Sequence, residues 1–306
     1  MSTERVVVTV DDRHLSLSNL GKVLYPDSGF TKGELLDYYS RIAGVMLPHL
    51  TNRPVTFRRF PDGVGGKSFV EKHVPSHAPD WLHTVKVPSA SSGQGRGRSA
   101  GGDVEYAVID DKPALIWAAN LAAIEFHVPL WHAGRRNQLP GRPDHLVFDL
   151  DPGPGTSVVE CCRIAGWIAD RLAAGKREPV AKTSGAKGMQ VYVGLPRGTG
   201  WDAARERAFG LAQSVQREHP GLVVTNMKRQ LRRGRVLIDW SQNHPAKTTV
   251  AVYSLRGGPE PSVSAPVTWD EVTECERSGD PDRLRFTAGE VLDRVAKHGD
   301  LFASLA

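Results

Sequence analysis

Apolar residues recur at helical spacing in the first part of the chain. Thr31 can cap a helix, and the side chains that follow it at this spacing are Leu35, Leu36, Tyr39, Ile42 and Val45. The pattern predicts a helix over residues 32–49. Short apolar runs predict strands over residues 6–10 and 55–60, and the apolar stretch 114–127 is expected to begin as a helix.

The second half of the chain alternates between strand and helix patterns. Strands are predicted over residues 145–150, 180–182, 190–195 and 236–240, and helices over residues 157–174, 201–219 and 289–298. This alternation indicates an α/β or α+β lobe. The low-complexity stretch 89–102, SASSGQGRGRSAGG, is predicted to be a flexible basic loop.

Composition narrows the class of protein without naming a function. The chain has 306 residues, 40% of them hydrophobic, which suits one large domain or two packed lobes. Its net charge of +5 fits a polyanionic partner but does not demand one. The three cysteines lack C-x-x-C spacing, which argues against a disulfide framework or a zinc cluster. Because no signal peptide or long apolar run is found, we expect a cytoplasmic protein that does not cross a membrane.

The segment HLVFDLDPGPG places two carboxylates at the end of an apolar strand. Asp149 and Asp151 are two residues apart, so both side chains project from the same face of the strand. Two such carboxylates repel each other, and an oxygen-preferring cation such as Mg²⁺ or Mn²⁺ would remove that cost. Taken alone, the pair fits a solvated strand end better than a metal site.

Asp239, in VLIDWSQN, changes that balance. It also closes an apolar strand, and three carboxylates at two strand ends can hold two metal ions about 4 Å apart for phosphoryl transfer. On its own, Asp239 would be interpreted as an acid that caps the following turn.

Two further segments carry groups suited to phosphate. TSGAKG, residues 183–188, offers the Ser184 hydroxyl, the Lys187 charge and two glycines that let the backbone approach an anion. It lacks the Walker A pattern, so alone it indicates a surface hairpin turn. Lys247 and Arg256 flank a predicted strand in KTTVAVYSLRG, and Arg256 suits bidentate contact with phosphate.

Two other features have an ordinary explanation when taken singly. His127 lies in the apolar segment AIEFHVPLWH and would by default be a core residue. The basic run MKRQLRRGRV, which includes Arg232 and Arg233, would by default be a solvated face. Because the run directly precedes the Asp239 strand, we expect it to contact a template or primer.

These segments together resemble one family. Their order and spacing are similar to those of the bacterial branch of the archaeo-eukaryotic primase family; the segments are FDLDPG, TSGAKG, VLIDWSQN and KTTVAVYSLRG. The chain is most similar to the polymerase domain of bacterial ligase D and to related stand-alone primase-polymerases. LSNLGKVLYPDSGFTKGELLDYY, RPVTFRRFPDGV and FVEKHVPSHAPDWL extend the similarity, which covers about residues 15–303.

The resemblance implies a fold for the whole chain. It is a single α/β (α+β) primase-polymerase domain over residues 1–306, with an RRM-like catalytic sheet and a second packed α/β lobe. The N-terminal lobe is expected over about residues 1–140 and the catalytic, metal-binding lobe over residues 141–306, with the active cleft between them.

The resemblance also implies roles for particular residues. Asp149, Asp151 and Asp239 match the metal ligands, for two Mn²⁺ or Mg²⁺ ions. The expected nucleotide contacts are His127, Ser184, Lys187 and Arg256, to which we add Gln242 and Lys247. The expected DNA contacts are Asn19, Lys22 and Lys32 for a 5′-phosphate, Arg58 and Phe69 for template and primer, and Arg232 and Arg233.

The three residues expected at the 5′-phosphate lie around one turn. Lys22 and Lys32 straddle YPDSG, which should bring them together at the start of the helix. The first turn of that helix, near Thr31, is expected to add free backbone N–H groups and the positive end of the helix dipole, and both suit a phosphate.

Two positions depart from the family pattern. The motif S-G-x-x-G-x-His, whose last position is expected to contact the triphosphate, ends here in Gln190, which keeps a hydrogen bond but loses the option of a positive charge. This weakens the case for a triphosphate contact at residue 190. Ligase D domains often carry an aromatic pair before Glu-Lys, whereas this chain has Phe69 and Val70 and so lacks one stacking platform for template bases. Both differences favour a stand-alone paralogue over a ligase D domain.

The function implied by the resemblance is template-directed nucleotidyl transfer in the repair of DNA gaps or breaks. A primer 3′-hydroxyl attacks the α-phosphate of a nucleotide, preferably a ribonucleotide, and releases pyrophosphate. Expected partners are gapped or broken DNA with 5′-phosphates, NTPs or dNTPs, and an ATP-dependent DNA ligase and Ku. We expect a monomer associated with the nucleoid.

Two alternatives stay open at this point. One is a module that bridges DNA ends for a ligase, and the intact carboxylate trio argues against that as the sole function. The other is a metal-dependent nuclease, which would not need TSGAKG or Arg256.

Overall fold

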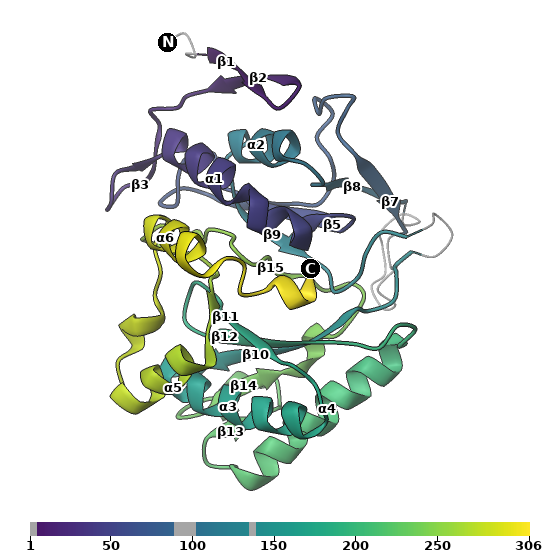
Figure 1. Ribbon diagram of the computed structural model, residues 1–306, viewed down its shortest axis with the longest axis vertical. Coiled ribbons are helices and arrows are strands. Elements are labelled where there is room, and N and C mark those ends of the chain that lie inside the picture. Colours follow the sequence, from purple (N-terminus) through teal and green to yellow (C-terminus); the bar gives the residue numbers. More distant parts are fainter. Residues whose placement is uncertain (1–4, 89–101, 135–138) are drawn as a thin grey trace.

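A computed structural model describes residues 5–88, 102–134 and 139–306. It is a mixed α/β molecule in which two sheets lie one above the other (Figure 1). The predicted basic loop over residues 89–102 falls, except for Gly102, outside the described residues.

The first sheet has the strand order β15-β9-β5-β8-β7, with β6 paired to β5, and all its pairs are antiparallel. Its strands are β5 (Pro54–Arg59), β6 (Phe69–Glu71), β7 (Thr84–Val87), β8 (Val104–Val108), β9 (Ala123–Val128) and β15 (Thr249–Val250). Two small hairpins precede it in the chain, β1 (Arg5–Val10) with β2 (Arg13–Ser18), and β3 (Val23–Tyr25) with β4 (Phe30–Thr31).

The second sheet has the order β13-β14-β10-β12-β11-β16 and is antiparallel except for the β13–β14 pair. Its strands are β10 (His145–Pro152), β11 (Val180–Thr183), β12 (Met189–Gly194), β13 (Val223–Val224), β14 (Val236–Asp239) and β16 (Pro266–Val267).

Helices cover the outer faces of both sheets (Figure 1). Above the first sheet lie α1 (Lys32–Leu50) and α2 (Lys112–Asn120), and below the second lie α3 (Val158–Ala174), α4 (Trp201–Glu218) and α5 (Trp269–Ser278). The last helix, α6 (Ala288–His298), contacts α1. Short 3₁₀ turns are η1 (Arg229–Leu231), η2 (Trp240–Gln242), η3 (Pro281–Leu284) and η4 (Ala303–Leu305).

The long predicted elements are confirmed within one or two residues. α1 begins at Thr31 with a capping box to Glu34, and the stretch 114–127 does begin in a helix, α2, before it continues as β9. α5 was not predicted, because only Val272 and Cys275 on it are buried and its apolar stripe is correspondingly thin.

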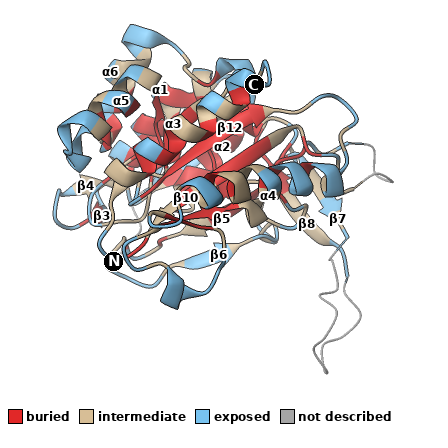
Figure 2. Cartoon of the chain, turned by 90° about the horizontal axis from the view of Figure 1, so that it is seen from below, coloured by how far each residue is buried: buried red, intermediate tan, exposed pale blue. Residues whose placement is uncertain are grey.

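Side-chain alternation along β10 decides which face carries chemistry. Phe148 and Leu150 belong to the core beneath the second sheet, whereas Val147 belongs to the core beneath the first. Because alternate residues point to opposite faces, Asp149 and Asp151 lie on the face turned toward the first sheet. Buried residues gather along the strands, and exposed ones on the outer helix faces (Figure 2).

The chain passes from the first sheet at β9 to the second at β10 and later returns to the first. β15 joins the first sheet, although β14 and β16 on either side of it belong to the second. The core of the first sheet also contains residues from the C-terminal part of the chain, among them Tyr253, Val263, Ala288 and Phe302.

All three cysteines of the sequence are free and buried in the core beneath the second sheet: Cys161 and Cys162 on α3, and Cys275 on α5. In the described parts of the chain, no helix is both long enough and apolar enough to span a membrane.

Candidate active site

A row of polar residues crosses the face of the second sheet that is turned toward the first. Asp149 on β10 pairs with Asp239 on β14 and with Gln190 on β12, and Gln190 pairs in turn with Lys182 on β11. Directly opposed residues of antiparallel strands share a face. The sheet therefore places two of the three predicted metal ligands side by side, and the third, Asp151, two residues along the same strand.

The charges of these carboxylates are poorly compensated by the protein. Burial, and then the charge of Asp151, raises the pKa of Asp149 to about 7, although the Gln190 hydrogen bond opposes this rise. Burial and the charge of Asp239 also raise the pKa of Asp151. Crowded, buried oxygen ligands of like charge fit a divalent cation.

The three carboxylates do not yet converge on one point. Among residues 5–88, 102–134 and 139–306, no three His, Cys, Asp or Glu side chains form a ready metal cluster. Asp239 caps η2 instead: it accepts hydrogen bonds from the Ser241 backbone at 2.9 Å, the Ser241 hydroxyl and Gln242 Nε2 at 3.2 Å. The turn-capping role considered for Asp239 is thus present in the structure.

Two predicted nucleotide contacts therefore lie against Asp239. Gln242 touches it directly, and Lys247 reaches it through a hydrogen bond to Ser241 Oγ. Ser241 was not predicted. Its position two residues after an acid at a strand end, where an Asx-type turn forms, is the signal that could have found it.

Glu125 on β9 of the first sheet is a buried carboxylate that was also not predicted, and several site residues contact it. His127 Nε2 lies 2.8 Å from Glu125 Oε2, and the Gly257 N–H donates to Oε1 at 2.9 Å. The guanidinium groups of Arg58 and Arg256 lie 3.4 Å and 3.7 Å from the same Oε1. One side chain thus holds three predicted site residues together.

Glu125 is ionised in this setting. Burial alone would raise its pKa, but the His127 hydrogen bond, the Arg256 charge and the Gly257 N–H together lower the pKa of Glu125 to about 2. The sequence signal was weak, because a single acid at an alternate strand position usually faces solvent.

The TSGAKG segment forms the turn between β11 and β12. Ser184 Oγ accepts from the N–H groups of Ala186 at 3.2 Å and Gly188 at 3.1 Å, so its own hydroxyl proton remains available. Gly188 serves packing more than anion approach, because a Cβ there would lie 2.1 Å from the Leu150 carbonyl oxygen.

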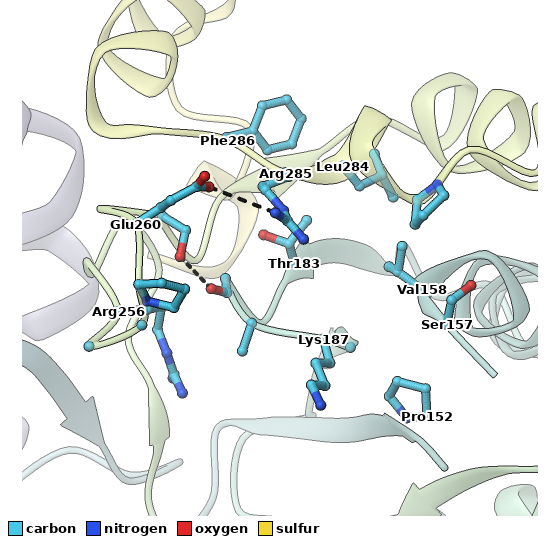
Figure 3. A pocket seen from close by; sticks show the side chains of 18 of the residues that line it. Pro152, Ser157, Val158, Thr183, Lys187, Arg256, Glu260, Leu284, Arg285 and Phe286 are labelled. Carbon is cyan, nitrogen blue, oxygen red and sulfur yellow. Dashed lines mark hydrogen bonds and ion pairs between the residues drawn. The ribbon is translucent and has the colours of Figure 1, made fainter. Parts of the chain in front are cut away.

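A cavity of about 660 Å³ lies beside this turn, lined among others by Arg58, Glu125, Lys187 and Arg256. Lys187 and Arg256 extend in the same direction, away from Phe286 and from the Glu260–Arg285 ion pair (Figure 3). The three aspartates do not line the cavity, although Pro152, which follows Asp151, does. The cavity therefore adjoins the carboxylate row without containing it.

The predicted 5′-phosphate residues meet at the start of α1. The Lys32 N–H donates to the Lys22 carbonyl at 2.8 Å, and the Lys22 N–H donates to the Asn19 carbonyl at 3.0 Å. Lys22 pairs with Asp62 at 3.2 Å, while buried Lys32 donates to the Ser18 carbonyl at 2.6 Å. The prediction that Lys22 and Lys32 come together on either side of the turn between β3 and β4 is confirmed.

The expectation of free helix N–H groups at this place is wrong. The N–H groups of Thr31, Lys32, Gly33 and Glu34 all have partners: Glu34, Lys22, Leu20 and Thr31. The capping box and the hairpin satisfy the donors that a phosphate would have used. Any phosphate site here must therefore rely on side chains, those of Asn19, Lys22 and Lys32.

The remaining candidates lie at the edges of the site. Phe69 is 44% exposed and stacks under the Arg59 guanidinium, 5.1 Å from its ring centroid. Arg232, next to η1, donates to the Met227 carbonyl at 3.0 Å, and its charge lowers the pKa of Asp151 against the larger effect of burial. Arg233 is exposed.

The carboxylate row and the TSGAKG turn lie in a chain that matches one known family over most of its length. The family model of the LigD primase-polymerase domain matches residues 31–302. The chain belongs to this family. LigD of Mycolicibacterium smegmatis, a multifunctional non-homologous end joining protein, is 41% identical over 289 residues, which cover 94% of this chain and 36% of that protein. The bifunctional LigD of Bacillus subtilis is 29% identical over 286 residues, 93% of this chain and 43% of that protein.

The fold agrees with a solved LigD structure. The polymerase domain of Mycobacterium tuberculosis ligase D in complex with DNA superposes with a TM-score of 0.85 at 38% identity, covering 95% of this chain and 97% of that domain. The family and α/β fold inferred from the motifs are thus confirmed, and the chain is a nucleotidyltransferase of the primase-polymerase class. LigD polymerase domains depend on metal ions. The chain spans less than half the length of the LigD relatives it matches.

Proposed function

We propose that the chain adds nucleotides, preferentially ribonucleotides, to a primer 3′-hydroxyl at gaps or breaks in DNA. The observation that carries the proposal is the direct pairing of Asp149 with Asp239 on adjacent strands, with Asp151 on the same face. Beside them, the turn of Ser184 and Lys187 and the Glu125-bound pair of His127 and Arg256 offer a triphosphate site.

Asp149, Asp151 and Asp239 would hold two divalent ions, Mn²⁺ or Mg²⁺. Such ions increase the acidity of the 3′-hydroxyl and neutralise the departing pyrophosphate. Side chains of the protein orient the substrates: Lys187, Arg256 and the Ser184 hydroxyl bind the phosphates, and His127, held by Glu125, borders them.

The DNA contacts belong to the same proposal. Lys22 and Lys32, with Asn19, would bind the 5′-phosphate downstream of a gap, and Arg58 and Phe69 would position template and primer. Arg232 adds charge beside Asp151, and the exposed Arg233 would contact template or primer. The DNA-bound state of the similar polymerase domain supports a DNA partner. We further propose that the protein works with a DNA ligase and Ku. It would act as a monomer in the cytoplasm.

Two further parts of the proposal concern organisation. We assign residues 1–140 to an N-terminal lobe and residues 141–306 to a catalytic lobe. β15 belongs to the second segment of the chain but joins the sheet of the N-terminal lobe. The departures at Gln190 and Val70 support a stand-alone paralogue.

The test is primer extension on a gapped duplex, with each of rNTP and dNTP, in Mg²⁺ and in Mn²⁺. We expect extension with faster use of rNTPs, and no extension by Asp149→Ala or Asp239→Ala, both of which still bind DNA. The exposed acid Asp293 on α6 provides a matched control, and Asp293→Ala should keep full activity. Wild-type extension rates in either site variant would refute the metal assignment, and DNA binding without extension by the wild type would favour an end-bridging module.

A further inference from the structure

The position at which this chain departs from the family motif lies next to a proposed metal ligand. Gln190 is 3% exposed and directly opposes Asp149 across the β10–β12 pair. Its Nε2 donates to Asp149 Oδ1 at 3.0 Å. The residue that departs from the motif thus contacts a proposed metal ligand from within the sheet.

The orientation of the Gln190 amide is set from its other end. Tyr192 OH donates to Gln190 Oε1 at 3.2 Å and lies 2.9 Å from Thr249 Oγ1 on β15. Tyr192 stays protonated, because burial raises the pKa of its hydroxyl. Thr249 Oγ–H can donate to the tyrosine oxygen in turn, so the chain of hydrogen bonds runs in one direction, from Thr249 to Asp149.

This direction follows from the chemistry of the groups. The ionised carboxylate, which is the form that binds a metal ion, only accepts, so the amide presents its NH₂ to Asp149 and its oxygen to Tyr192. All of these side chains are buried or partly buried between the two sheets, where a fully satisfied network restricts each member to one rotamer. The bond engages Oδ1 of Asp149 and leaves Oδ2 out of it.

We propose that Gln190, fixed by Tyr192 and Thr249, is a positioning residue that holds the Asp149 carboxylate in the orientation required for metal binding. The inference rests on the proposed metal-dependent function. It assigns the glutamine a role on the metal side of the site, rather than the triphosphate contact that its place in the motif implies. Partners that orient a metal ligand typically account for about 10-fold to 100-fold of metal affinity.

The test measures Mn²⁺ binding to the free protein, without DNA or nucleotide, by the electron paramagnetic resonance signal of unbound Mn²⁺. Gln190→Leu removes the amide at similar volume and should weaken Mn²⁺ binding about 10-fold to 100-fold. Tyr192→Phe removes only the hydroxyl behind the amide and should weaken binding less, by several-fold. Tyr38→Phe is the matched control, because Tyr38 is also buried in the first core but its hydroxyl donates to the Tyr253 carbonyl instead of to Gln190.

Primer extension adds a second readout. In Gln190→Leu the Mn²⁺ concentration for half-maximal rate should rise, while the KM for NTP at saturating Mn²⁺ stays near that of the wild type. Unchanged Mn²⁺ affinity in folded Gln190→Leu, or a changed KM for NTP with unchanged Mn²⁺ affinity, would overturn the inference. If Gln190→Leu does not fold, Tyr192→Phe decides alone: Mn²⁺ affinity equal to that of Tyr38→Phe would overturn it.

Failure of this inference and failure of the proposed function are distinguishable. Asp149→Ala should abolish the Mn²⁺ site. If it does while Gln190→Leu binds Mn²⁺ normally, only the positioning role is lost. If Asp149→Ala itself binds Mn²⁺ normally, the metal assignment is wrong as well.

Discussion

At the scale of single residues, the site depends on a few buried groups whose charge is set by their neighbours. Glu125 is the clearest case, since it binds His127, Arg256 and the Gly257 N–H while almost fully buried. Removing its charge leaves the cationic partners without their acceptor.

We therefore expect Glu125→Gln to lower the free energy of unfolding at pH 7 by about 1.5–3 kcal/mol, the usual contribution of hydrogen bonds to charged groups. The pH dependence gives the sharper test. The lowered pKa of Glu125 contributes stability above the unfolded-state pKa, and this contribution is lost as pH falls toward about 2. Denaturant melts between pH 7 and pH 3 should show a flatter decline for the variant, and parallel curves for the two proteins would contradict the assignment.

Lys32 supports a second pH prediction. Burial, followed by the charges of Lys22 and Arg59, lowers the pKa of Lys32 to about 8. The charged form needed for phosphate binding is therefore present below pH 8 and is lost as pH rises above it. A terminal phosphate carries its second charge above about pH 6. The preference for a 5′-phosphorylated gap over a 5′-hydroxyl gap should be greatest between these values.

Fluorescence anisotropy at one salt concentration measures this preference, because salt shifts all such affinities. The double variant Lys22→Glu with Lys32→Glu should show no preference at any pH. Lys176→Glu with Lys297→Glu, at two exposed lysines outside the site, serves as the control for the same change in net charge. A preference that is constant from pH 7 to pH 9 would exclude Lys32 from the pocket.

The sequence predicted the placement of residues where that placement follows from local spacing. Asp149 and Asp151 follow from the strand period of two, and the bracketing of a turn by Lys22 and Lys32 follows from the turn residues between them. Glu125 and Ser241 were not predicted. Their importance depends on which strands and loops become neighbours, and this information is not contained in local spacing.

At the scale of elements, helices with wide apolar stripes and capping residues were predicted to within one or two residues, whereas two-residue strands such as β13, β15 and β16 were not. Such strands have too few residues to show a period. Packing in the β11–β12 turn could not be predicted either. Its sequence indicated a loop that binds an anion, but Gly188 is also required because a larger residue would collide with the backbone of β10.

Gly188→Ala tests that packing. A Cβ at this position would lie 2.1 Å from the carbonyl oxygen of Leu150, which sits between the two aspartates of β10. We expect a loss of about 1–3 kcal/mol in stability, as for other overpacked cores, together with reduced primer extension. Thermal unfolding monitored by circular dichroism measures the first effect.

Gly210→Ala is the matched control for this substitution. Gly210 lies exposed in α4 with nothing within 4 Å of an added Cβ. This change should raise stability by about 0.5–1 kcal/mol, since alanine favours a helix over glycine. Equal melting temperatures for the Gly188→Ala variant and the wild type would show that β10 yields to the added methyl group.

At the scale of the whole molecule, the two sheets are not independent units. β15 and residues from Tyr253 to Leu305 complete the core of the first sheet from the far end of the chain. Tyr38 on α1 donates to the Tyr253 carbonyl at 2.8 Å, and the Leu255 N–H donates to Tyr39 OH at 3.1 Å. Sequence periodicity could not reveal this return, because it involves contacts over more than 200 residues.

A fragment of residues 1–140 should therefore not fold alone. It would leave one edge of β9 unpaired and lack a part of its core, so we expect no cooperative unfolding transition in circular dichroism and poor dispersion of amide signals. The full chain, measured under the same conditions, should unfold in one transition. A cooperative transition in the fragment would contradict this dependence.

The placement of the cysteines turns the protein into its own reporter of opening. All three thiols lie in the core beneath the second sheet, and burial raises the pKa of each, most strongly for Cys161 and Cys162. An alkylating reagent can react only with the thiolate that forms when α3 and α5 separate from that core. The rate of alkylation under native conditions would therefore measure how often the core beneath the second sheet opens. No label has to be added, and the core of the first sheet would not contribute, because the sequence has no other cysteine.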